Sequence, residues 1–147
     1  MSATEPEAAA ALTRPDPVFT PDAAFFWEGA ARGELLGQRC ALCLRFAHPP
    51  RPMCPHCHST QREVVKLSGR GTVYSWIMPR HPQPVGFADS PLVVLIDLQE
   101  GIRLVSNVID VQSERMRPGL PVEVIFAPTQ GGRAVPIFRP VNGGGDV

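Results

Sequence analysis

The chain has 147 residues, and its 14 basic and 14 acidic side chains give a net charge of zero at pH 7. This balance argues against a protein that binds nucleic acid through bulk electrostatic attraction, and no apolar run reaches the length needed to span a membrane. The length allows one compact domain, or a small metal module beside one modest core. Because the N-terminus lacks a basic region followed by an apolar stretch, we expect a cytoplasmic protein with reduced thiols.

The first predicted elements are a lead-in and one helix. Residues 1–19 are rich in Ala, Glu and Pro without sustained periodicity, which predicts a flexible segment. A helix is expected within residues 20–33, because Thr20 has the residue type of a helix cap and Gly33 that of a helix end. Two interpretations of this helix stay open: it clamps across the next module, or its aromatic side chains are exposed and bind a partner. The aromatic residues are Phe25, Phe26 and Trp27.

All four cysteines lie within residues 34–62, in two closely spaced CxxC pairs. Each CxxC turn brings two thiolates to one side of a loop, and two facing turns make a tetrahedral cage that suits zinc or, less often, a single iron. Because four thiolates fill the coordination shell, the site should hold the fold together and not catalyse a reaction. The predicted ligands are Cys40, Cys43, Cys54 and Cys57.

Other interpretations of the cysteines fit less well. Two disulfides would need an oxidising compartment, and a dithiol redox site needs one CxxC pair beside a βαβ pattern, which is absent. His48 or His58 could replace a cysteine as a metal ligand, but four cysteines suffice. We therefore interpret His48, His56 and His58 as surface residues.

The rest of the chain predicts strands and no long helix. Short strands at residues 34–39 and 46–50 complete a zinc ribbon, and residues 63–140 carry five or six further strands with short turns. A sheet of this size avoids exposed edges by closing, so a five-stranded barrel of the OB type is the first interpretation and a small open sandwich the alternative. The fold class is mainly β: helix, rubredoxin-like zinc ribbon, OB barrel, and a flexible glycine-rich tail at residues 141–147.

A long loop at residues 79–91, with four prolines, offers candidate ligand contacts. We expect Arg80 and His81 to contact phosphate or carboxylate groups and Phe87 to make apolar contacts. In the preceding strand, alternation places Tyr74 and Trp76 on one aromatic face, opposite the face of Val73, Ser75 and Ile77. The alternative is that Trp76 packs against the ribbon and that the loop merely connects.

The residues themselves argue against catalysis. His81 is the one histidine outside the ribbon, and no Ser-His-Asp or Cys-His spacing surrounds it.

Single-stranded nucleic-acid binding is a competing class of function, because proteins of that class also use OB folds and stacking aromatic residues. Neutral charge and the lack of a basic stripe count against it. A structural scaffold without a ligand is the third class.

Several stretches, taken in order, resemble one known family. They are Phe25-Phe26-Trp27-Glu28-Gly29, the cysteine block from Leu35 to Cys57, Ser68-Gly69-Arg70-Gly71-Thr72-Val73-Tyr74-Ser75-Trp76, Leu104-Val105-Ser106-Asn107-Val108, and Gly119-Leu120-Pro121-Val122-Glu123-Val124. This chain resembles the acyl-CoA-associated proteins, in which a rubredoxin-like zinc ribbon is fused to an OB fold and which were long catalogued as a domain of unknown function. The resemblance covers about residues 21–140.

The resemblance implies an accessory subunit of a thiolase-like enzyme. Similar proteins assist aldolases that shorten steroid side chains, an archaeal thiolase–synthase assembly, and acyl-transferring complexes of natural-product pathways. It implies that the thiolase-like partner holds the catalytic residues and that this chain supports the assembly; in some proteins of the family the corresponding subunit also helps to bind the acyl-CoA thioester. The resemblance also implies a role in acyl-CoA, sterol side-chain or polyketide-like metabolism.

Overall fold

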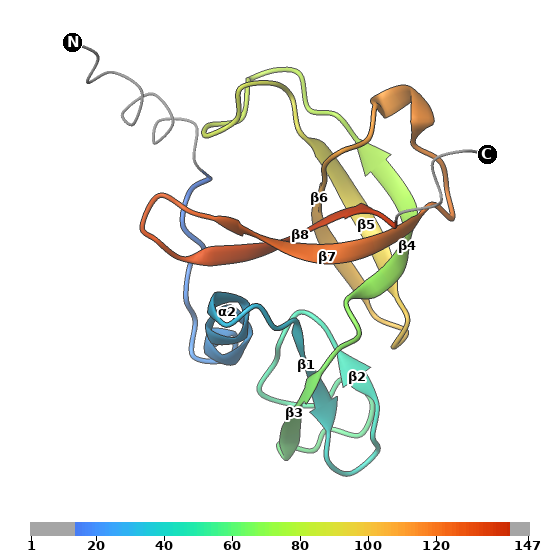
Figure 1. Cartoon of the computed structure of the whole chain (residues 1–147). Helices are drawn as coiled ribbons and strands as arrows, with labels where there is room; N and C mark the ends of the chain where they lie inside the picture. Colours follow the sequence, from blue (N-terminus) through green and yellow to red (C-terminus); the bar gives the residue numbers. More distant parts are fainter. Residues whose placement is uncertain (1–13, 142–147) are drawn as a thin grey trace.

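The computed structural model describes residues 14–141. Of the flexible segments predicted for residues 1–19 and 141–147, residues 1–13 and 142–147 lie outside the described residues. The described chain forms a short helix, a small three-stranded sheet and a barrel, and the helix and the small sheet lie side by side below the barrel in the view of Figure 1. None of the helices in this part of the chain is long and apolar enough to cross a membrane.

The small sheet is the zinc ribbon. Its strands are β1 (Leu36–Cys40), β2 (Phe46–Ala47) and β3 (Arg62–Lys66), in the order β2-β1-β3, and both pairs are antiparallel. The central strand β1 ends at Cys40, so the sheet carries the first cysteine turn at its end.

The barrel has five strands and is closed. They are β4 (Arg70–Ile77), β5 (Leu92–Leu98), β6 (Arg103–Val108), β7 (Pro121–Pro128) and β8 (Ala134–Pro140), and a single 3-10 turn, η1 (Ser113–Arg115), lies between β6 and β7. The order β4-β5-β6-β8-β7 returns to β4, with β6 and β8 parallel and the other pairs antiparallel. Closure removes the sheet edges. This confirms the OB-type barrel and shows that the open sandwich was wrong.

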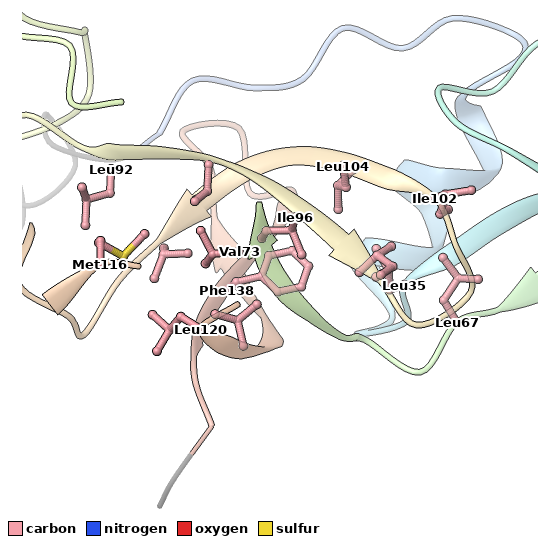
Figure 2. Packing of buried hydrophobic residues seen from close by; sticks show 14 of the residues in the cluster. Leu35, Leu67, Val73, Leu92, Ile96, Ile102, Leu104, Met116, Leu120 and Phe138 are labelled. Atoms are coloured by element: carbon pink, nitrogen blue, oxygen red, sulfur yellow. The ribbon is translucent and has the colours of Figure 1, made fainter. Parts of the chain in front are cut away.

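Ribbon and barrel share one hydrophobic core. Phe138, Ile96 and Val73 fill the barrel and are essentially inaccessible to solvent. The same cluster continues to Leu35 and Leu67, which lie where the ribbon meets the barrel (Figure 2). Burial of these side chains ties the two modules into a single packed unit.

Helix α2 (Ala24–Ala31) packs against β1 of the ribbon and β8 of the barrel. Its end follows the prediction: Gly33 has φ of 75°, its N–H donates to the carbonyl of Ala30, and the N–H of Glu34 donates to the carbonyl of Gly29. Its start differs, because residues 21–23 form a turn and the helix has no side-chain cap.

The predicted alternation along β4 is wrong. The pairing with β5 shifts between Val73 and Ser75, which marks a β-bulge. Because the extra residue changes which side chains face inward, Val73 and Trp76 both pack against the core, whereas Tyr74 and Ile77 are exposed. Tyr74 and Trp76 therefore do not form one aromatic face.

Residues 14–19 lie against the turn between β7 and β8, although they belong to the predicted flexible lead-in. The carboxylate of Asp16 accepts hydrogen bonds from the hydroxyl of Thr129 (2.5 Å) and the N–H of Gly131 (3.0 Å). The first of these bonds lowers the pKa of Asp16 most. This segment is thus held to the barrel by side-chain and backbone contacts.

Candidate metal centre and its surroundings

The two CxxC turns are built alike and face each other. In each, the N–H of the residue after the second cysteine donates to the carbonyl of the first: Leu44 to Cys40 and His58 to Cys54, both at 3.0 Å. Leu44 and His58 also have nearly equal positive φ angles, 64° and 65°. The turns are therefore two copies of one backbone motif, which the sequence did not reveal because glycine is the usual residue at such angles.

The four sulfur atoms converge on one point. All lie within 4.8 Å of one another, with Cys40 Sγ 3.5 Å from Cys57 Sγ and Cys43 Sγ 3.6 Å from Cys54 Sγ. A tetrahedral zinc site with Zn–S bonds of about 2.3 Å has sulfur–sulfur edges of about 3.8 Å. The four thiols are all free. The donor set and its dimensions therefore fit a tetrahedral zinc ion held by Cys40, Cys43, Cys54 and Cys57.

Backbone N–H groups favour thiolates at this centre. The N–H of Cys43 donates to Cys40 Sγ at 3.4 Å and is the main reason that the pKa of Cys40 is lowered to about 6. The N–H of Cys57 likewise lowers the pKa of Cys54. The N–H of Arg45 acts to lower the pKa of Cys43, but burial and hydrogen bonds with neighbouring sulfurs raise it to about 11. Without a metal the thiols thus share protons, and a divalent cation would displace them.

A buried glutamine, Gln38, supports the loop between the cysteine turns. Its side chain exchanges two hydrogen bonds with the backbone of Arg51: Nε2 donates to the carbonyl at 2.8 Å, and Oε1 accepts from the N–H at 2.9 Å. Arg62 donates to the same Oε1 at 3.1 Å. We did not single out Gln38 from the sequence, although a polar residue directly after Leu35, Leu36 and Gly37 was the available signal.

The structure separates the three aromatic residues of α2. Phe26 is buried, so it is unavailable to a partner, and its ring contacts Trp27 edge-on. Phe25 and Trp27 are half-buried and pack against the same core. The Phe25 ring also lies beneath the guanidinium of Arg62, which connects helix and ribbon. The clamp interpretation of α2 therefore accounts for Phe26, and the partner role of Phe25 and Trp27 stays a prediction.

The histidines near the cage differ in burial. His56 and His58 are exposed, as predicted for surface residues, and His56 Nδ1 lies 3.0 Å from Arg45 Nη1. The prediction that His48 is a surface residue is wrong, because it is half-buried, with its ring 5.6 Å from that of Phe26. This burial lowers the pKa of His48.

The five predicted ligand residues do not form one site. Trp76 packs against the core cluster, and Tyr74 lies on the outer surface beneath the guanidinium of Arg103. Arg80 and His81 are exposed in the 79–91 loop, whereas Phe87 is half-buried and lines a cavity.

Comparison with known families gives two matches in the same order as the modules of the structure. The zinc-ribbon domain of ChsH2, described as rubredoxin-like, matches residues 27–63, and the C-terminal OB-fold domain of ChsH2 matches residues 64–127. A solved structure, the Ltp2-ChsH2(DUF35) aldolase, contains a chain that is 38% identical with a TM-score of 0.81, and the match covers 85% of this chain and 98% of that one. The chain belongs to the DUF35 family.

Two curated relatives carry different descriptions. A probable enoyl-CoA hydratase alpha subunit of Thermomonospora curvata is 39% identical over 127 residues, which are 86% of this chain and 40% of the relative. A DUF35 domain-containing scaffold protein of Methanocaldococcus jannaschii is 37% identical over 95 residues, which are 63% of this chain and 67% of the relative. The chain thus spans less than half of the hydratase subunit and about two thirds of the scaffold protein.

Proposed function

We propose that this chain is a non-catalytic accessory subunit that binds a thiolase-like partner, such as an aldolase, in acyl-CoA metabolism. The observation that carries the proposal is the match to nearly the whole ChsH2(DUF35) chain of an aldolase, by a chain with the same ribbon and barrel. The names of the hydratase and scaffold relatives support the same role.

The metal centre supports a structural role for the ion and not a catalytic one. It is the one cluster of potential metal ligands found among residues 14–141. Four thiolates complete a tetrahedral shell, so no position is left for a water or a substrate. We propose zinc as the ion, because four sulfur donors in a small ribbon suit zinc best.

The outer surface of β4, β5 and β6 is the face that we propose for the partner. Ile77 of β4 and Val105 of β6 are 63% and 64% exposed. Leu95, in the strand β5 between them, is paired with Val105. The charges on this face neutralise each other: Arg103 pairs with Asp97 at 2.6 Å. An apolar face whose charges already form an ion pair is better suited to bind another protein than to bind the phosphate backbone of a nucleic acid.

Co-purification tests the proposal. A tagged chain, co-expressed with a thiolase-like protein of its own host, should recover that protein in a constant ratio through size-exclusion chromatography. Val105→Glu should abolish recovery, because it places a charge in the apolar face. Val85→Glu is the matched control, because Val85 is 80% exposed in the 79–91 loop.

Two results would overturn the proposal. One is a tagged chain that recovers only itself. The other is a purified monomer that turns over an acyl thioester unaided. Tight binding of single-stranded DNA that weakens steeply with salt would favour the nucleic-acid alternative instead.

A further inference from the structure

A cavity of about 410 Å³ lies beside the 79–91 loop, between the N-terminal segment and the barrel. Its apolar lining includes Met78, Phe87, Leu92 and Val111, and its one basic lining residue is Arg14. The volume is in the range of sites that hold small molecules. Arg14 precedes the first residue that either ChsH2 domain matches, so the family comparison assigns no role to it.

Arg14 is held in place by its backbone. The N–H of Gln130 donates to the carbonyl of Arg14 at 2.8 Å, and Arg14 forms a parallel bridge with Thr129. Its guanidinium carbon lies 5.1 Å from the centre of the Phe87 ring. The side chain is therefore positioned against the cavity wall by contacts at both of its ends.

One nitrogen of the Arg14 guanidinium is buried without an acceptor. Its Nε is buried and has no hydrogen-bond partner among residues 14–141, and no carboxylate in that range pairs with it. Burial removes water from the cation, which lowers the pKa of Arg14. An oxyanion bound in the cavity would supply the missing counter-charge, and the guanidinium group would donate charge-assisted hydrogen bonds to it.

We propose that this cavity binds a small molecule that carries a carboxylate or phosphate group on an apolar body. Arg14 donates to the oxyanion, and Phe87, Met78 and Val111 contact the apolar part. Asp89 also lines the cavity, outside ion-pair distance of Arg14, and its charge opposes a bound anion. The site goes beyond the accessory role, because it belongs to the isolated chain and needs no partner.

Calorimetric titration of the full chain tests the site with three probes. Octanoate and octyl phosphate distinguish the carboxylate from the phosphate, and inorganic phosphate tests whether the apolar body is needed. We expect one octyl probe or both to bind with a stoichiometry of one, and inorganic phosphate to bind at least about tenfold more weakly.

Two substitutions should change the affinity for the octyl probe in opposite directions. Arg14→Gln should weaken binding of the octyl probe at least about tenfold, because it removes a charge-assisted hydrogen bond. Asp89→Asn should tighten binding, because it removes the opposing charge from the lining. Arg117→Gln, an equal charge change at an exposed position, should leave binding unchanged. A general loss of folding would weaken binding in every variant, so tightening by Asp89→Asn is specific to the site.

The proposal is overturned if neither octyl probe binds, if inorganic phosphate binds as well as they do, or if Arg14→Gln binds like the wild type. Weakening by Arg117→Gln to the same extent as by Arg14→Gln would also overturn it. These titrations use the chain alone, whereas the accessory role is tested by recovery of a partner, so either proposal can fail without the other.

Discussion

Leu44 and His58 occupy equivalent positions in the two cysteine turns. Each follows the second cysteine of its pair, each has a φ near 65°, and each N–H donates to the carbonyl of the first cysteine at 3.0 Å. Non-glycine residues seldom adopt this backbone conformation. The repeated geometry indicates that positioning four sulfurs decides the backbone here, at the expense of local preference.

This relationship gives a prediction for residue 44. Leu44→Val should lower the free energy of unfolding by about 1–2 kcal/mol, because a β-branched side chain is more strained at positive φ. Leu44→Gly should leave it unchanged or raise it, because glycine adopts that angle freely. Denaturant unfolding at a fixed zinc concentration measures both. Leu42→Val, two residues away and exposed, is the control, and an equal loss there would refute the explanation.

The metal centre predicts one zinc ion per chain by elemental analysis. Cys54→Ser should lose the metal and unfold the ribbon, because metal binding supplies much of the folding free energy of such modules. His56→Ala is the control: its ring lies beside the cage but is not needed to complete four sulfur ligands. A Cys54→Ser protein with full metal content and unchanged melting would show that the assignment is wrong.

Gln38 should be essential to the stability of the ribbon. Gln38→Leu leaves the N–H of Arg51 without its partner and the Arg51 carbonyl with Arg62 Nη1 alone, which should cost about 1–3 kcal/mol of unfolding free energy. Gln61→Leu makes the same chemical change at an exposed ribbon position and should have little effect. Equal stability of the two variants in denaturant unfolding would contradict the role of Gln38.

His48 predicts a pH dependence of stability. Because burial holds its folded-state pKa below the usual 6.5, the unfolded chain binds the proton more readily. The contribution of neutral, half-buried His48 to the free energy of unfolding is therefore complete above about pH 6.5. It is lost as the pH falls below that value, with a slope of at most about 1.4 kcal/mol per pH unit. His48→Gln should make the free energy of unfolding depend less on pH between about pH 5 and 7, whereas His81→Gln, at an exposed position, should not. Identical curves for wild type and His48→Gln would exclude this role.

Much of the architecture was predictable because local chemistry specified it. Strands were predicted within residues 63–140, where runs such as that of β5 are rich in β-branched residues with strong strand character, and Gly33 marked the end of the helix. The parts that failed depend on neighbours in space. The bulge in β4 turned Trp76 inward, and the packing of His48 on Phe26 cannot be read from spacing along the chain.

The sequence by itself determined the four-cysteine ribbon, the mainly β class and the family, because ligand spacing, residue periodicity and short motifs are properties of neighbouring residues. Only the tertiary structure decided how Gln38 holds the loop between the cysteine turns and how Arg14 comes to lie over Phe87, more than seventy positions further along the chain. Barrel closure brings such distant segments together, and burial then decides which of their polar groups need a partner.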